Sequence, residues 1–287
     1  MPTILVVANQ TLAGQPLIDA ILDKAGESEG GPASGTPKAR VVICVPRSRP
    51  KHGALIYDEA VYDAAQVRID LARGFLRQHG IEAVGDVGDP DPYTATMDAV
   101  ADFSPDEIIV STLPAASSGW LKRDLIERIE GATGLPVTHI TTDVETQRHS
   151  FGVTLVVANR TTSGPELIEA LKAKATDDGH RFIVVVPQEG GGGVAAAAAR
   201  GRLSQLRERA RVAGLVTAGM VGDPDPFTAT MNALELFRIR DVVISTLPET
   251  RSGWLRADLV ERVRRASNLP VEHVVAGQPA AGAAQEA

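Results

Sequence analysis

The stretch GDPDPYTATM at residues 88–97 returns almost unchanged as GDPDPFTATM at residues 222–231. In each occurrence an apolar run precedes it and a segment of helical period follows, so the motif predicts a turn between a strand and a helix. Asp91 is placed to accept a hydrogen bond from the backbone at the start of that helix, and Pro92 suits its first position. A repeat of this length indicates that the chain contains one unit twice.

Further blocks repeat in the same order along the chain. They are ILVVAN at 4–9 with TLVVAN at 154–159, STLP at 111–114 and 245–248, SGWL at 118–121 and 252–255, and LPV at 135–137 and 269–271. The first copy is longer, mostly in its first two connections. We therefore expect two copies of one unit, at 1–142 and 152–276, followed by a disordered tail at 277–287.

Within each copy, short apolar runs rich in β-branched residues alternate with segments of helical period. This alternation predicts an α/β fold, in which a parallel sheet is covered by helices on both faces. Five strands are expected in the first copy, at 4–8, 40–45, 82–87, 107–112 and 137–141. The predicted fold is two tandem flavodoxin-like three-layer domains, each with a five-stranded parallel sheet in the order 3-2-1-4-5.

Composition narrows the classes of function. The 36 acidic and 29 basic residues leave a net charge of −7, which disfavours nucleic acid and anionic membrane surfaces as partners. The N-terminus lacks a basic leader segment, and no apolar run approaches the roughly 20 residues of a membrane span. Cys44, the single cysteine, lies in an apolar run and is expected to be buried. These features predict a cytoplasmic protein.

Ligands of open α/β sheets bind beyond the carboxyl ends of the strands, where the strand order reverses. The loops after the first and fourth strands therefore supply the candidate binding residues Asn9, Ser111, Thr112, Ser117, Ser118 and Gly119, and their counterparts Asn159, Ser245, Thr246, Ser252 and Gly253. A structural alternative stays open, in which Ser118 caps a helix, Gly119 permits a tight turn and Trp120 packs in the core.

Two further features have both a functional and a structural interpretation. Asp89 and Asp91 could hold Mg²⁺ or share a proton in hydrolysis, or they could form a turn and a helix cap. The connections after the second strand differ, since residues 47–52 are basic and residues 188–193 contain four glycines; we expect a solvated loop and a flexible connector. No Ser-His-Asp or Cys-His set is visible, so no catalytic residue and no metal ligand is assigned.

Each copy resembles a universal stress protein domain. Three features carry the likeness: the first strand ending at Asn9, the turn at 88–90 that closes the third strand, and the run from Asp106 through Val137. In nucleotide-binding members an acidic residue after the first strand meets the adenosine, and a loop of the form G-x2-G-x9-G-S/T cradles the phosphates. The resemblance therefore implies a nucleotide site at the same edge of the sheet.

This sequence departs from the family pattern at each of those points. Asn9 and Asn159 replace the acidic residue, Ser111 and Ser245 the first glycine, and Pro114 and Pro248 stand near the second; the Gly-Ser/Thr pair falls near residues 123–124 and 257–258. Proline removes a backbone donor, and an aspartate at 124 or 258 repels an anion. We expect ATP to bind weakly or not at all, although ATP or another nucleotide stays open as a cofactor.

The resemblance implies a non-catalytic stress-response or regulatory protein that binds a small ligand or a partner. A metal-dependent phosphoester-processing enzyme and a purely structural scaffold stay open as alternatives. In this family the last strand commonly forms the dimer seam, so we expect the strands at 137–141 and 271–275 to pair in an intramolecular pseudo-dimer. A homodimer is also open.

Overall fold

The computed structural model describes residues 1–25, 39–47, 58–115, 118–120, 124–143, 152–175, 180–190, 192–248, 253–256 and 258–277. The described residues form two compact units, one around each of two sheets. Residues 26–38, residues 144–150 between the two copies and the expected tail from residue 278 onward lie outside the described residues. The same holds for Ser117 and Ser252 and for most of the basic connection at 47–52.

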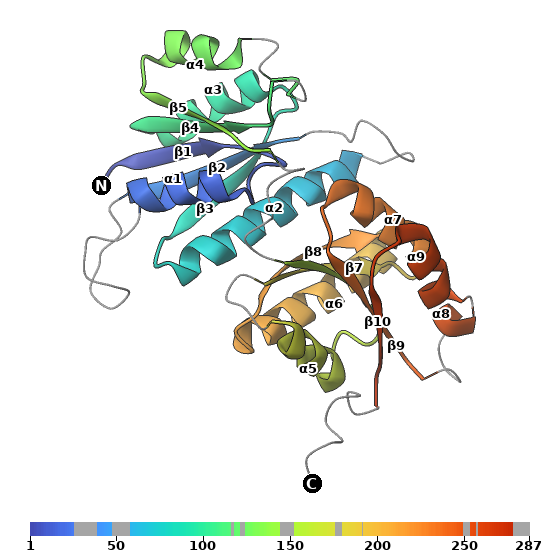
Figure 1. Ribbon diagram of the computed structural model, residues 1–287. Coiled ribbons are helices and arrows are strands. Elements are labelled where there is room, and N and C mark those ends of the chain that lie inside the picture. The colour runs from blue at the N-terminus through green and yellow to red at the C-terminus, as the bar shows by residue number, and fades with distance from the viewer. Residues whose placement is uncertain are drawn as a thin grey trace. The chain divides into compact units, whose positions relative to one another are not determined.

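The first copy contains five strands and four helices among its described residues (Figure 1). These are β1 (Thr3–Val7), α1 (Gln15–Ala25), β2 (Arg40–Pro46), α2 (Asp58–Gln78), β3 (Ala83–Gly88), α3 (Pro92–Phe103), β4 (Glu107–Thr112), α4 (Leu125–Thr133) and β5 (Val137–Thr141). All neighbouring strands are parallel, in the order β3-β2-β1-β4-β5. The predicted α/β class, strand positions and strand order are confirmed.

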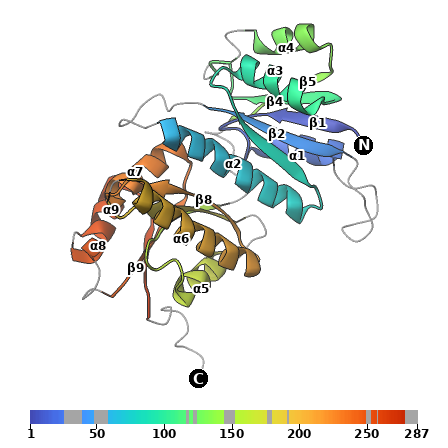
Figure 2. The ribbon, with the colours of Figure 1, turned by 180° about the vertical axis from the view of Figure 1, so that it is seen from behind.

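The second copy repeats this arrangement of strands, and Figure 2 shows its helices α5 to α9 from behind. Its elements are β6 (Val153–Val157), α5 (Pro165–Lys174), β7 (Arg181–Pro187), α6 (Gly193–Val212), β8 (Val216–Gly222), α7 (Pro226–Leu236), β9 (Asp241–Thr246), α8 (Gly253–Arg256), α9 (Leu259–Ser267) and β10 (Val271–Val275). The sheet order β10-β9-β6-β7-β8 is the first order read from its other edge. The two halves are therefore an intramolecular repeat of one fold.

Each face of the first sheet is covered by its own pair of helices. Ile4 and Val6 of β1 point to a core that contains residues of α1 and α2, whereas Leu5 and Val7 point to a core with residues of α3 and α4. Alternate side chains of a strand lie on opposite faces, so both sets must be apolar when both faces are covered. This explains the continuous apolar run at 4–8 that predicted the strand.

The repeated GDPDP motif forms the turn and cap that its residues predict. The Asp91 carboxylate accepts a hydrogen bond from the Thr94 backbone at 3.0 Å, and the Asp89 carboxylate accepts one from the Asp91 backbone at 2.8 Å. Asp225 and Asp223 make the same two contacts in the second copy. These carboxylates satisfy backbone donors at the starts of α3 and α7, which confirms the capping interpretation.

The helix before the last strand begins later than its sequence indicates. The apolar period predicts a helix that includes Leu121, whereas α4 begins at Leu125, and residues 121–123 lie outside the described residues. Asp124 has a left-handed φ of 47°, and Asp258 has a φ of 52° before α9. A left-handed residue cannot lie inside a right-handed helix, so each aspartate sets a helix start.

The left-handed residue at 124 gives a testable order of stability. Asp124→Ala and Asp124→Gly both remove the carboxylate, but only glycine adopts a left-handed φ without steric cost. We expect the glycine variant to be more stable than the alanine variant by about 1 kcal/mol in urea unfolding, the reverse of their helix propensities. An alanine variant as stable as the glycine variant would show that Asp124 is not left-handed.

Cys44 lies on β2 with 1% of its surface exposed, as its apolar run predicts. Burial, with a smaller contribution from nearby Asp86 and Asp98, raises the pKa of its thiol to about 12. The thiol therefore stays protonated and unreactive. Separately, in the described part of the chain no helix is both long and apolar enough to cross a membrane.

Candidate ligand site at the carboxyl edge of the second sheet

In both copies the loop after the first strand meets the carboxyl end of the fourth strand, at the edge where the order of the strands reverses. The Thr11 hydroxyl donates to the Ser111 carbonyl at 3.1 Å, and the Thr161 hydroxyl donates to the Ser245 carbonyl at 3.2 Å. These contacts hold the loop that follows Asn9 or Asn159 against the strand end that carries Ser111 or Ser245. The serines and threonines at 111, 112, 245 and 246 are all buried.

The last residue of the fourth strand is hydrogen-bonded to the last strand in each copy. The Thr112 hydroxyl lies 2.8 Å from Nε2 of His139, and the Thr246 hydroxyl lies 2.8 Å from Nε2 of His273. Burial, followed by the positive charge of Arg264, lowers the pKa of His273, so its neutral ring is favoured as a hydrogen-bonding partner. The paired histidines therefore connect the fourth and fifth strands.

The repeated serine is satisfied differently in the two copies. The Ser111 hydroxyl lies 3.4 Å from the Thr142 hydroxyl. Ala276 is the counterpart of Thr142. Each follows the last strand of its copy, and each donates its backbone N–H to the carbonyl of the threonine that ends the fourth strand. The Ser245 hydroxyl is buried and has no hydrogen-bond partner among the described residues.

The two candidate asparagines also differ in their contacts. Asn9 donates to the carbonyl of Pro46, a contact to the neighbouring strand β2. Asn159 instead accepts from Nη1 of Arg202 at 2.8 Å and donates to Glu189 at 3.4 Å. Asn159 is therefore part of a charged network, whereas Asn9 completes a backbone contact.

The charged network consists of Arg160, Glu189 and Arg202, here named the Glu189 cluster. Arg160 donates to the Glu189 carboxylate from Nε at 2.5 Å and from Nη2 at 3.2 Å, and Arg202 donates from Nη2 at 3.3 Å. The hydrogen bond from Arg160 is the main cause that lowers the pKa of Glu189. With two guanidiniums and one carboxylate, the cluster carries a net charge of +1.

A cavity of about 270 Å³ lies beside this cluster. Its lining includes Arg160 and Glu189, together with four residues that the sequence marked as candidates: Asn159, Ser245, Thr246 and Gly253. Trp254, from the short helix α8, closes part of the wall. The second copy therefore brings most of its predicted residues to one cavity.

The predicted residues of the first copy take mainly structural positions. Ser118 is buried, Gly119 is exposed, and Trp120 packs against the core between the sheet and α3 and α4. This packing agrees with the structural interpretation of the SGWL block. Asn9, Ser111 and Thr112 lie together at the carboxyl edge of β1 and β4.

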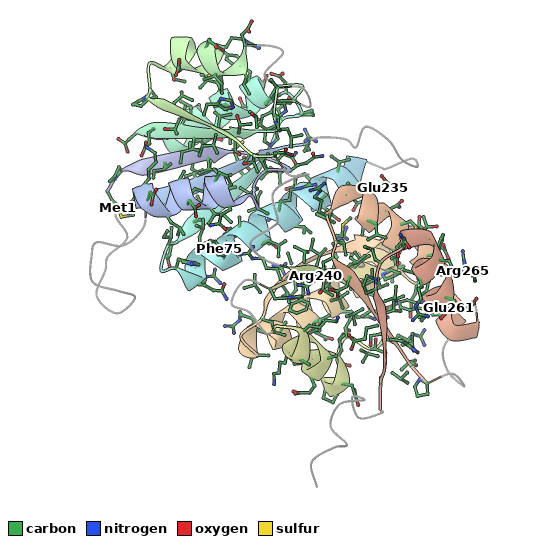
Figure 3. The ribbon with its side chains drawn as sticks, in the orientation of Figure 1. Met1, Phe75, Glu235, Arg240, Glu261 and Arg265 are labelled. Carbon is green, nitrogen blue, oxygen red and sulfur yellow. The ribbon has the colours of Figure 1, made fainter. Side chains whose placement is uncertain are left out.

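The backbone near the phosphate loop of the family differs from an anion cradle. Pro114 and Pro248 are the second residues after β4 and β9 and offer no N–H donor. Asp258 adds a carboxylate at the start of α9, where Arg265 donates to it at 3.2 Å; Figure 3 shows Arg265 on this helix. A helix start that already presents a carboxylate attracts a phosphate poorly.

No protein-family model and no curated protein matches this chain. Among solved structures, a universal stress protein from Archaeoglobus fulgidus is 15% identical, with 97% of each chain covered and a TM-score of 0.33. A protein from Pseudomonas aeruginosa described as a universal stress protein is 15% identical, with 96% of this chain and 93% of that chain covered and a TM-score of 0.28.

The chain is similar to universal stress proteins over almost its entire length. A ketoreductase domain from the bacillaene assembly line also matches, at 11% identity over 85% of this chain and 58% of that chain, with a TM-score of 0.20. All of these identities and TM-scores are low.

Sequence reasoning missed Arg160, Glu189 and Arg202. Glu189 belongs to the connection interpreted only as flexible, yet two arginines hold its carboxylate. Arg160 follows Asn159 directly and could have been noticed, because the first copy has Gln10 at that position. Arg202 gives no sequence signal, since a charged residue on a helix usually faces solvent.

Proposed function

We propose that this chain is a non-catalytic stress-response or regulatory protein of the universal stress type, which binds a small ligand in its second copy. The cavity beside the Glu189 cluster is the observation that carries the proposal. Its position matches the usual ligand edge of an open α/β sheet, and its wall offers the carboxamide of Asn159, hydroxyl groups and the guanidinium of Arg160. Such groups orient a polar ligand without changing it.

The enzyme alternative finds little support in the same residues. Thr246 lies within hydrogen-bond distance of His273, as a nucleophile and base would, but Thr246 is only 2% exposed. Asp89 and Asp91 are engaged by the backbone of their own turn. Among the described residues, no group of three or more His, Cys, Asp and Glu side chains could hold a metal ion.

Native mass spectrometry of the protein as purified tests ligand binding directly. We expect a small bound molecule that is retained by Asn9→Ala and lost in Asn159→Ala, because only Asn159 contacts the Glu189 cluster. ATP should bind more weakly than low micromolar by calorimetry, since Pro248 and Asp258 disfavour its phosphates. If no variant and no wild-type sample carries a ligand, the scaffold alternative replaces this proposal.

We also propose that the two copies form an intramolecular pseudo-dimer, in which the last strands β5 and β10 pair. β5 pairs with β4 and β10 pairs with β9, so each is an edge strand of its own sheet with a free edge to cover. We expect Thr138→Cys and Glu272→Cys to form a cross-link within one chain, detected as faster migration on a denaturing gel. Cys44 should not compete, because burial raises the pKa of its thiol to about 12.

A chain with Thr138→Cys and Glu261→Cys is the control, since Glu261 lies on α9 rather than on an edge strand. Equal cross-linking of the two pairs would contradict the pseudo-dimer. Cross-links only between separate chains would replace the pseudo-dimer with a homodimer.

A further inference from the structure

The Glu189 cluster already displays the geometry of carboxylate recognition. Arg160 holds both carboxylate oxygens of Glu189, one from Nε at 2.5 Å and one from Nη2 at 3.2 Å. This two-pronged contact is the arrangement in which a planar guanidinium matches a planar carboxylate. The pair of hydrogen bonds selects a carboxylate more strongly than it selects a single oxygen.

The second arginine is oriented before any ligand arrives. Arg202 uses Nη1 on the Asn159 side chain at 2.8 Å, which leaves Nη2 directed at Glu189 at 3.3 Å. Arg202 is also the less exposed of the two, with 25% of its side chain exposed against 66% for Arg160. A guanidinium that is already held in place loses little entropy when it binds an anion.

Glu189 itself is held weakly enough to leave. Its side chain is 36% exposed, so water competes with the two arginines for its carboxylate. Gly190 and Gly192 follow it with φ values of +90° and +99°, and nothing lies within 4 Å of where their Cβ atoms would be. The backbone after Glu189 therefore has the freedom to move the carboxylate away from the arginines.

We propose that Glu189 is an internal stand-in for the carboxylate of a small organic acid, and that this ligand displaces Glu189 from Arg160 and Arg202. The cavity of about 270 Å³ is near the lower end of ligand pockets, which suits a small acid. The unpartnered hydroxyl of Ser245 lies at a residue of the same wall. We expect a hydroxyl or second carboxylate of this ligand to contact Asn159 or Ser245 in the cavity wall.

The inference applies to the second copy alone. Gln10 stands at the position of Arg160, so the first copy lacks one of the two guanidiniums. It also rests on the proposed function, because it names the class of ligand for the same cavity. Its test therefore uses a defined probe rather than the molecule that co-purifies.

Calorimetry with glutarate, which carries the carboxylate and short stem of a glutamate side chain, tests the displacement. We expect Glu189→Gln to bind glutarate at least about tenfold more tightly than the wild type, because the competing charge is removed. Glu189→Ala should show the same gain if the amide of the first variant interferes. Glu208→Gln is the matched control. Glu208 forms an exposed ion pair with Arg211 within α6, the helix that also carries Arg202, so this variant should leave glutarate binding unchanged.

Two further measurements decide the interpretation. The gain should disappear when Arg202→Met is added to Glu189→Gln, and it should be smaller for orthophosphate than for glutarate. Equal glutarate affinity in wild type and both Glu189 variants, or an equal or larger gain for orthophosphate, would overturn the inference. A ligand that co-purifies with wild-type protein would still support the proposed function in that case, so the two failures are distinguishable.

Discussion

Gly219→Ala is expected to lower the free energy of unfolding of the second copy by about 3 kcal/mol. Gly219 lies in β8, and an added Cβ would come within 2.4 Å of the Val184 carbonyl oxygen and 2.6 Å of Cδ1 of Leu203. The first of these atoms belongs to the backbone of the paired strand β7, so it cannot rotate away. Either the strands or helix α6 must shift, and both shifts loosen the core.

Urea unfolding in a Trp120→Phe background measures this effect, because Trp254 then reports on the second copy alone. Gly201→Ala is the matched control on α6, since nothing lies within 4 Å of its added Cβ. This control should raise stability by about 0.5–1 kcal/mol through helix propensity. A Gly219→Ala protein within about 0.5 kcal/mol of the wild type would show that α6 does not pack on β8 as described.

The elements that could be predicted are those whose causes are local. The cap at Asp91 follows from a carboxylate three residues before its backbone donor, and the strand at 4–8 follows from an apolar run that needs two covered faces. The break before α4 could not be predicted in this way. It depends on the left-handed φ of Asp124, which the helical period of the neighbouring apolar residues does not reveal.

The candidate site could be predicted in position but not in chemistry. The loops that form it were recognised because parallel strands bring their carboxyl ends together. The Glu189 cluster was not, since Arg160 lies 29 residues from Glu189 and Arg202 lies 43 residues from Asn159. No short motif links residues at these separations, so only the folded chain brings their charges together.

The repeat also hid a difference between the copies. Ser111 and Ser245 are identical in sequence, yet only Ser111 keeps its hydroxyl partner, because Ala276 has replaced the counterpart of Thr142. A repeated residue therefore does not imply a repeated role. The role depends on contacts contributed by other connections, and these connections diverged between the copies.

Asp241→Ala is expected to lower the free energy of unfolding by about 3 kcal/mol, because it breaks a polar cluster at the amino end of the strands of the second sheet. Asp241 is 8% exposed and accepts from the Thr154 hydroxyl at 3.0 Å, while Lys174 lies 3.1 Å from its carboxylate. Burial lowers the pKa of Lys174, but its hydrogen bonds to Glu272 and Asp241 outweigh this and raise that pKa. Removing the carboxylate leaves a partly buried ammonium with one partner fewer.

The first copy provides the control for this loss. Lys24 pairs with Glu107 at the equivalent position, and their side chains are 32% and 25% exposed, against 23% and 11% for Lys174 and Asp241. Because water screens the more exposed pair, Glu107→Ala should cost only about 1 kcal/mol in the same urea experiment. Asp241→Asn should fall between the two, since it keeps an oxygen for Thr154 and loses only the charge. Equal losses for Asp241→Ala and Glu107→Ala would show that burial does not set the strength of this repeated ion pair.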